Sequence, residues 1–285
     1  MAQPVDLSKV FPIYKVENDC ILSKQGDVTL AFEVVLPEIF TLSDQEYESF
    51  HQVLVKAIKV LPPYSVFHKQ DWFFSKRQEA DFIGKDEKEL SFLSRSSERF
   101  FNERPYLDHK CYVFLTRKPA NRKPSSSVFS NLIRRTIVPE ETLNAQRMQE
   151  FLDSAGQFER ILQDSGFVRL QRIKDDELAG TKNKAGLLER HCFLLSDSEK
   201  PIIRDIHFNE EFRIGDQHCQ LYSLADVEDL PSLCGSRINY DKYSTDKTKF
   251  SVGFASPLGQ LLSCNHIFNQ YIFIEDSHKT IKQLE

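Results

Sequence analysis

Three short segments bring histidine and cysteine close enough together to suggest a metal site. They are His191-Cys192, His218-Cys219 and Cys264-Asn265-His266. A structural zinc site needs four ligands that converge on one point. Neighbouring residues in a strand point to opposite faces, so His218 and Cys219 cannot easily bind one ion together. Cys264 and His266 could share a face of an extended segment, but two further ligands are missing, and the pattern favours packing roles without a metal.

Other catalytic patterns are incomplete. The segment from Gly180 to Gly186 resembles a phosphate-binding loop, but its glycines are one residue too far apart and Leu187 stands where lysine is required. The motifs GxGxxG, GxSxG and HExxH do not occur. The carboxylate pair Asp175-Asp176 is typical of a helix N-terminus. The sequence therefore predicts no catalytic residue and no cofactor, and an enzyme with an unrecognised site remains as an alternative.

A basic run is the sharpest electrostatic feature. Residues 110–139 contain no acidic side chain, and proline and serine separate the basic ones. The candidate contacts to phosphates of DNA or of anionic lipid are Arg117, Lys118, Arg122, Lys123, Arg134 and Arg135. The other interpretation is a solvated hinge. Phe129 is the one aromatic residue between Lys118 and Arg135, which gives little stacking support for single-strand binding and favours the hinge.

The elements that must position these residues alternate between strand and helix in the first part of the chain. Strands are predicted at Cys20–Lys24 and Val28–Leu36 around a Gln-Gly-Asp turn, at Tyr64–Phe74 and at Cys111–Leu115. Capping boxes at Ser43–Glu46 and Asp86–Glu89 each predict the start of an amphipathic helix. Pro62-Pro63 and Pro105 are expected to end these helices.

The second part begins with a predicted amphipathic helix over Glu140–Gln163, which Gly166 stops. A helical segment interrupted by glycine is expected over Asp175–Arg190. Strands are expected at Ile202–Phe208, Phe212–Ile214, His218–Leu224, Ser251–Leu262 and His266–Ile274, with a polar, turn-rich stretch at Tyr240–Lys249. Asp276 or Ser277 would cap a last helix that has no stop signal before Glu285, which suggests a fragment of a longer protein.

These elements predict an α+β fold of layered mixed or antiparallel sheets, with helices packed on one face. The length of 285 residues suggests two subdomains. We expect a first α+β subdomain at residues 1–117, a basic linker or loop at 118–139 and a second α+β subdomain at 140–285.

Composition indicates a soluble, cytoplasmic chain. The net charge of −5 gives no reason by itself to expect a nucleic-acid or membrane partner. The N-terminal sequence lacks a signal peptide, and no window approaches the roughly 18 apolar residues of a membrane span. The cysteines never form CxxC and read as reduced, mostly buried thiols: Cys20, Cys111, Cys192, Cys219, Cys234 and Cys264.

Two stretches resemble a known family. The opening PVDLSKVFPIYKVENDCILSKQGDVTLAFEVVLPEIFTLSDQEYESFH and the late segment SPLGQLLSCNHIFNQYIFIED are similar to TraG-type ATPases of conjugative transposons, relatives of the VirB-class motor of type IV secretion. The first resembles the start of those proteins, and the second resembles the segment before their C-terminal motor domain. The Walker motifs of that motor are missing from this chain, so no catalytic residue is carried over.

The resemblance implies a non-catalytic N-terminal region that docks a conjugation ATPase at the inner face of the cell membrane. Its expected partners are inner-membrane subunits of the secretion channel and the motor domain of the parent chain. The alternative is a DNA-handling domain that uses the basic 110–135 segment, and this alternative implies weak binding of DNA.

Overall fold

The computed structural model describes residues 6–37, 42–77, 91–119, 145–196, 200–208, 211–224, 226, 228 and 262–284. It has the expected α+β fold, with a main sheet of seven strands and a small sheet of three. The strands are β1 (Ile13–Glu17), β2 (Cys20–Ser23), β3 (Val28–Val35), β4 (Ser65–Lys76), β5 (Tyr106–Arg117), β6 (Arg169–Arg172), β7 (Ile206–Phe208), β8 (Phe212–Ile214), β9 (Gln217–His218) and β10 (His266–Ile274). The helices are α1 (Leu7–Val10), α2 (Asp44–Lys59), α3 (Phe92–Glu103), α5 (Ala145–Asp164), α6 (Asp175–Ala179), α7 (Leu187–Phe193) and α9 (Ser277–Leu284).

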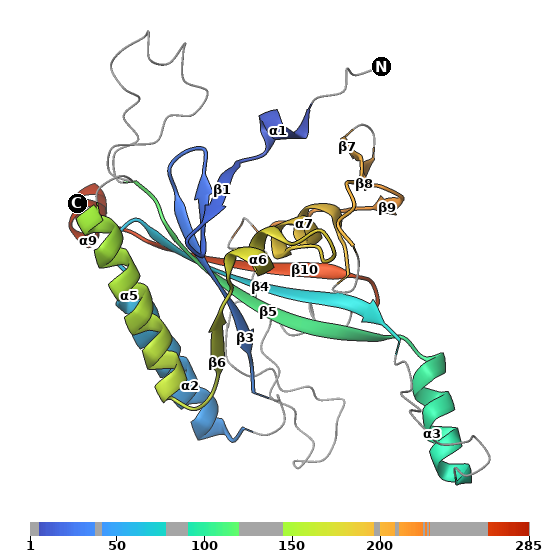
Figure 1. Ribbon diagram of the computed structural model, residues 1–285. Helices are drawn as coiled ribbons and strands as arrows, with labels where there is room; N and C mark the ends of the chain where they lie inside the picture. The colour runs from blue at the N-terminus through green and yellow to red at the C-terminus, as the bar shows by residue number, and fades with distance from the viewer. Residues whose placement is uncertain are drawn as a thin grey trace. The chain divides into compact units, whose positions relative to one another are not determined.

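The main sheet has the order β1-β2-β3-β5-β4-β10, and β6 pairs with β3 off this path (Figure 1). The pairs β1–β2, β2–β3, β3–β5 and β3–β6 are all antiparallel. The small sheet is the antiparallel meander β7-β8-β9. No helix in the described part of the chain is both long and apolar enough to cross a bilayer.

The chain forms two compact units that do not follow the sequential subdomains expected from the sequence. The first unit contains residues 1–69, 111–222 and 270–285, and the second contains residues 70–110 and 223–269. The reason lies in the pairing of β3, which bonds to β5 on one side and to β6 on the other. Strand β6, from the expected second subdomain, thus belongs to the same sheet as the first strands of the chain.

Local signals at the start of the sheet behave as predicted. Gly26 has a φ of 86° in the β2–β3 turn, where the Ser23 hydroxyl oxygen accepts the backbone N–H of Asp27 at 2.9 Å. Strand β1 was missed by the sequence analysis. It joins β2 through Asn18 and Asp19, whose φ angles of 55° and 56° are those of a primed hairpin turn.

Helices α2 and α5 run side by side and form the main core with the sheet (Figure 1). The Ser43 capping box is confirmed, because Ser43 N–H donates to the Glu46 carboxylate at 2.7 Å and its hydroxyl accepts the Glu46 N–H. The predicted apolar face of α5 is also confirmed by its buried residues. Phe158 of α5 packs against Phe67 of β4 with ring centroids 5.9 Å apart. The buried part of this core comprises Cys20, Val28, Leu30, Phe32, Val34, Ala57, Leu61, Phe67, Cys111, Val113, Leu115, Phe151, Ala155, Phe158, Leu162, Val168 and Leu170.

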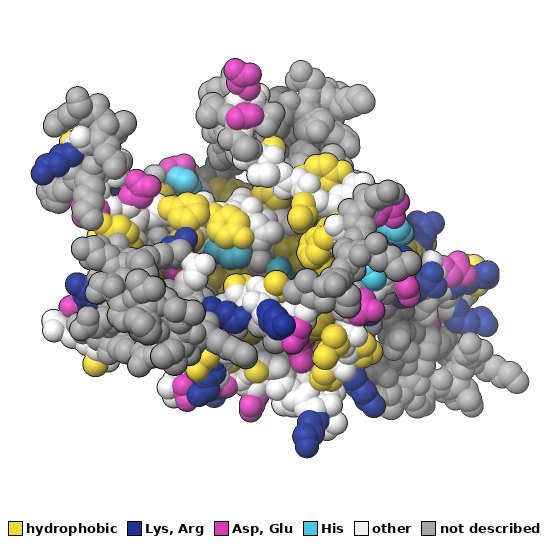
Figure 2. All heavy atoms as spheres, turned by 90° about the horizontal axis from the view of Figure 1, so that it is seen from above, with side chains coloured by type: hydrophobic (Ala, Val, Ile, Leu, Met, Phe, Trp, Pro, Cys, Tyr) yellow, Lys and Arg dark blue, Asp and Glu magenta, His cyan; other side chains and the backbone are white. Residues whose placement is uncertain are grey.

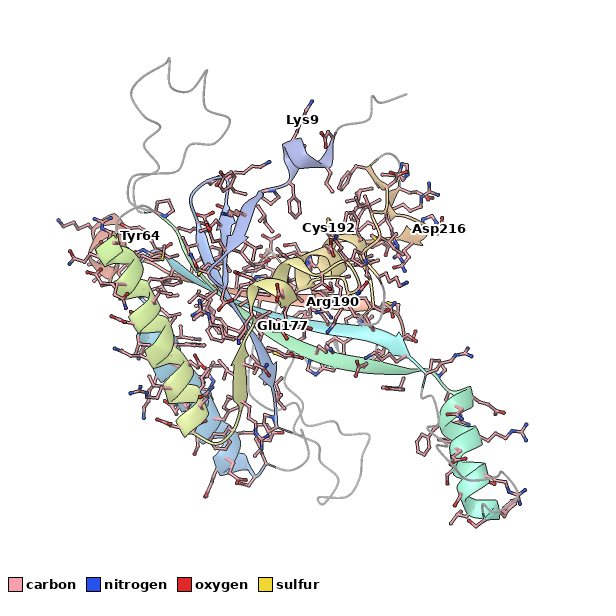
Figure 3. The ribbon with its side chains drawn as sticks, in the orientation of Figure 1. Lys9, Tyr64, Glu177, Arg190, Cys192 and Asp216 are labelled. Atoms are coloured by element: carbon pink, nitrogen blue, oxygen red, sulfur yellow. The ribbon has the colours of Figure 1, made fainter. Side chains whose placement is uncertain are left out.

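The glycines in the predicted helical segment after β6 separate α6 from α7, as expected. Gly180 has a φ of 84°, and its backbone lies against that of Gly186. A Cβ atom on Gly186 would stand 2.3 Å from the nitrogen of Gly180, so only hydrogen fits there. Figure 3 labels Glu177 on α6 and Arg190 on α7, the latter a buried residue of this helical pair.

Several predicted boundaries differ from the structure. Helix α3 has Ser91 as its N-cap within the described residues, while the expected capping box at Asp86–Glu89 lies outside them. Strand β5 is longer than the predicted Cys111–Leu115 because its ends are polar and carry no apolar run. The strand predicted at His218–Leu224 is wrong beyond His218, since β9 ends the small meander there. The Tyr240–Lys249 segment and nearly all of Ser251–Leu262 lie outside the described residues.

Candidate interaction surfaces

The basic residues singled out in the sequence are not brought together where the structure describes them. Arg117 and Lys118 lie at the end of β5, and the other four candidates, Arg122, Lys123, Arg134 and Arg135, lie outside the described residues. Adjacent residues of an extended chain point to opposite sides. Arg117 donates from Nη1 to the carbonyl oxygen of Arg147 at 3.0 Å, in the first turn of α5. Lys118 instead places its ammonium 5.2 Å from the ring centre of Phe273.

Arg117 therefore has a structural role that predicts a measurable effect. We expect Arg117→Ala to lower the free energy of unfolding by about 1–2 kcal/mol, because a charged donor that holds a helix end is lost. Lys118→Ala, at the neighbouring half-buried position, removes no hydrogen bond to α5 and should change it by less than about 0.5 kcal/mol. Urea titrations of both variants provide the measurement. Equal effects of the two substitutions would contradict the structural role of Arg117.

Strand β10 is an edge strand of the main sheet with many exposed side chains. It stands at the end of the strand order, and exposure affects both of its faces: Tyr271 is 55% exposed, Ile272 is 43% and Phe273 is 60%. The sequence of the strand, HIFNQYIFI, contains no acidic residue, lysine, arginine or proline. Natural edge strands usually carry such residues to prevent pairing with another chain. Within the described residues no further strand pairs with this edge, and the strand itself carries no charge that would oppose pairing.

A row of stacked rings crosses strands β5, β4 and β10. His68 of β4 stacks on Tyr271 of β10 at 4.1 Å and on Phe114 of β5 at 5.3 Å. Burial raises the pKa of the Tyr271 hydroxyl above its usual value. The stack holds the Tyr271 ring on the same face as His68, although Tyr271 remains exposed. Figure 2 shows exposed hydrophobic side chains in groups on one face of the molecule, with histidine beside some of them.

A hollow of about 420 Å³ lies at the end of β10. Tyr64, labelled in Figure 3, stands at its wall with a φ of 65°, and its N–H donates to the carbonyl of Ile274 at 2.7 Å. Lys118 is its basic wall residue, while Glu275 and Asp276 are acidic. The Glu275 carboxylate accepts the hydroxyl of Thr280 at 3.0 Å. Because the charges are mixed, the hollow does not suit a chain of phosphates.

Helix α3, in the second unit, has its amphipathic pattern reversed. Its half-buried side chains are polar, namely Ser94, Glu98 and Asn102, and none of its residues is fully buried. The apolar side faces outward: Phe92 is 79% exposed and Leu93 is 74% exposed, and Phe100 and Phe101 are also exposed. The sequence predicted a helix through these residues but gave no sign that its apolar face would point to solvent.

A histidine–carboxylate pair in the second unit was also missed. Nε2 of His109 lies 2.9 Å from Oδ1 of the buried Asp71, and Phe73 stacks between the rings of His109 and His266 at 4.6 Å from each. A carboxylate can orient a histidine for proton transfer, so among the described residues this pair is one that the enzyme hypothesis could use. The two residues are 38 positions apart, and no local motif links them.

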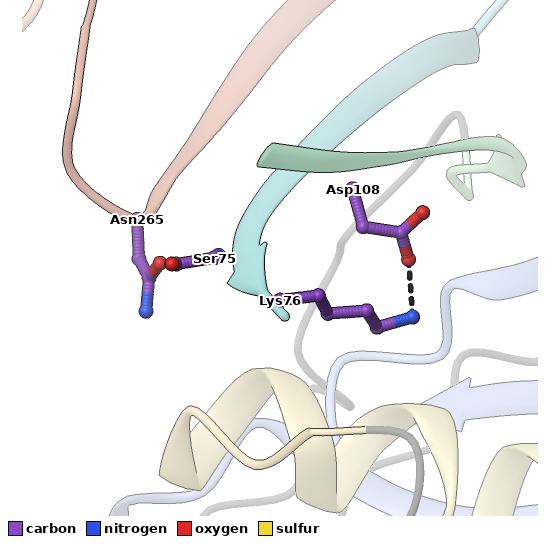
Figure 4. A network of polar contacts seen from close by, with 4 residues as sticks. All are labelled: Ser75, Lys76, Asp108 and Asn265. Carbon is purple, nitrogen blue, oxygen red and sulfur yellow. Dashed lines mark hydrogen bonds and ion pairs between the residues drawn. The ribbon is translucent and has the colours of Figure 1, made fainter. Parts of the chain in front are cut away.

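Polar contacts tie the strand ends of the second unit together (Figure 4). Lys76 forms an ion pair with Asp108, and the N–H of Ser75 donates to the side-chain oxygen of Asn265 at 2.7 Å. These contacts join β4 to β5 and to the residue before β10. They position strands, and the short network needs no ligand to explain it.

The metal-ligand patterns of the sequence do not converge. In the described part of the chain no three histidine, cysteine or acidic side chains are grouped to hold an ion. Nδ1 of His266 donates to the backbone carbonyl of Cys264 at 2.8 Å, so this pair forms a turn contact. The five described cysteines are free thiols, but the expectation that most are buried is wrong. Cys20 and Cys111 are buried, Cys192 and Cys219 are half-buried, and Cys264 is exposed. Burial raises the pKa of the Cys20 thiol.

Comparison with known proteins gives one partial match. Residues 1–52 match a family model named DUF3875, described as a domain of unknown function with the note "B. Theta Gene description". The matched residues contain β1, β2 and β3 and the beginning of α2. No curated protein matches the chain.

Proposed function

We propose that the chain is a non-catalytic docking and assembly module of a conjugative DNA-transfer ATPase, located in the cytoplasm and held at the inner face of the membrane by subunits of the secretion channel. The sequence resemblance to TraG-type ATPases supports the conjugation context. The outward apolar face of α3 carries the docking proposal, because a helix that half-buries its polar side and exposes aromatic side chains is suited to a partner's groove.

The charges of α3 favour a protein partner over a lipid surface. The helix contains two arginines, Arg95 and Arg99, and two glutamates, Glu98 and Glu103, so its net charge is zero. Arg99 also pairs with Glu103 at 2.8 Å. Helices that bind lipid surfaces carry an excess of lysine and arginine on their polar face. The partner is accordingly an apolar groove on a protein, such as a channel subunit that lies close to the membrane.

Substitution of the α3 face tests this proposal. Changing Phe92, Leu93, Phe100 and Phe101 together to serine should weaken the recovery of channel subunits in a pull-down at least about tenfold, because aromatic anchors dominate interface energies. Overproduced wild-type chain should lower transfer frequency in a donor cell by occupying docking sites, and the variant should not.

The matched control changes exposed apolar residues elsewhere to serine, namely Ile202, Ile203, Leu221 and Tyr222. This control should still bind and inhibit. If the α3 variant binds and inhibits as well as the wild-type chain, the docking proposal in this form is wrong. Circular dichroism and melting curves must show that both variants are folded.

The DNA-handling alternative has one supporting observation, the ammonium of Lys118 beside an exposed aromatic ring. Arg117 is engaged with α5, and the acidic Glu275 and Asp276 lie in the hollow that Lys118 lines. A variant with Lys118, Arg122 and Lys123 changed to glutamate separates the two functions. Loss of inhibition in this variant, with inhibition retained in the α3 variant, would favour DNA handling over docking.

A further inference from the structure

The exposed end of β10 is suited to pairing with a copy of itself. Residues 270–274 read Gln-Tyr-Ile-Phe-Ile, and in an antiparallel pair centred on Ile272 each Tyr271 stands opposite Phe273 of the second copy. Ile272 then faces Ile272, and Gln270 faces Ile274. Every pair in this register is uncharged, and the two aromatic pairs fall on one face of the sheet. Aromatic cross-strand pairs are among the favourable ones in sheets.

We propose that two copies of the chain associate through β10, so that their main sheets join into one continuous sheet across a twofold axis. Two observations select a second copy as the occupant. Residues 270–274 carry no charge that would repel an identical strand, and pairing about Ile272 sets each Tyr271 against a Phe273 and Ile272 against itself. A twofold axis also closes the assembly, because both unprotected edges are used at once.

The stack on His68 prepares this edge for pairing. Tyr271 is held between its neighbours by the ring of His68 at 4.1 Å, and the ammonium of Lys118 lies 5.2 Å from the ring centre of Phe273. Both side chains are therefore positioned before the second strand arrives, which reduces the loss of side-chain entropy on pairing. Ile272, on the opposite face, is 43% exposed and gains burial against its own copy.

This association is independent of docking through α3, which belongs to the other compact unit. It is tested by sedimentation of the full chain over a roughly hundredfold range of concentration, where mass action should convert monomer to dimer. Ile272→Lys brings two ammonium groups opposite each other at the axis and should weaken the dimer by about tenfold or more. Ile203→Lys, at a position that is 84% exposed, is the matched control and should leave the dimer unchanged.

Hydrogen exchange gives a second readout, which reports on the strand itself. The amides of residues 270–274 should become protected as concentration rises in the wild-type chain and not in Ile272→Lys. A monomer at every concentration overturns the inference, as does a dimer that both lysine variants form equally well. If Ile272→Lys abolishes channel-subunit binding while the wild-type chain stays monomeric, another protein occupies the edge and the second copy is wrong. The α3 variant should still dimerise, so dimerisation can be tested even if the docking proposal is wrong.

Discussion

Replacing Phe158 with alanine is expected to lower the free energy of unfolding by about 3–5 kcal/mol, the cost of removing a large ring from a packed core. Phe158 is fully buried in α5 and packs against Phe67 of β4. Urea denaturation followed by circular dichroism measures the change. Tyr222→Ala removes an aromatic ring at an exposed position of the same unit and should cost less than about 0.5 kcal/mol.

A double-mutant cycle makes this prediction specific for the observed core. If α5 packs on β4, the effects of Phe67→Ala and Phe158→Ala should couple by about 0.5–3 kcal/mol. If residues 1–117 and 140–285 formed independent cores, the two effects would be additive. Additive effects would therefore contradict the single core that unites elements from both halves of the chain.

The second large effect is expected at Gly186. Its φ of −75° is accessible to any residue, so the effect of Gly186→Ala is purely steric. The added Cβ would lie 2.3 Å from the nitrogen of Gly180 and 2.5 Å from the carbonyl oxygen of Leu178. Both are backbone atoms that cannot turn away as a side chain can. Forcing α6 and α7 apart should cost about 3 kcal/mol or more.

Gly156→Ala is the matched control for Gly186→Ala. Gly156 lies within α5, and a Cβ there would meet no atom within 4 Å. Alanine should therefore stabilise the protein by about 0.5–1 kcal/mol through its higher helix propensity. Thermal melts of the two variants should shift in opposite directions. A stabilising effect at Gly186 would mean that the close approach of α6 and α7 is absent in solution.

Local signals predicted much of the secondary structure. The capping box at Ser43, the proline pair after α2 and the glycine at 166 mark element ends through backbone chemistry that acts within a few residues. The apolar spacing of α5 predicted its buried face, because a helix of fixed period places those side chains together wherever it packs. Strand β10 was predicted from its β-rich run of residues. The absence of charged residues from that run could also have predicted an edge strand without charged protection.

The partners of these elements depend on contacts between distant residues. Nothing near Arg169 indicates that β6 bonds to β3, and nothing near Asp71 indicates that His109 will lie beside it. The two basic neighbours Arg117 and Lys118 separate because a strand turns successive side chains to opposite faces, and only the position of α5 gives one of them an acceptor. Helix α3 is the clearest case. Its periodicity predicts an apolar face, but whether that face is buried depends on the free energy of packing against the rest of the fold, which a local pattern does not contain.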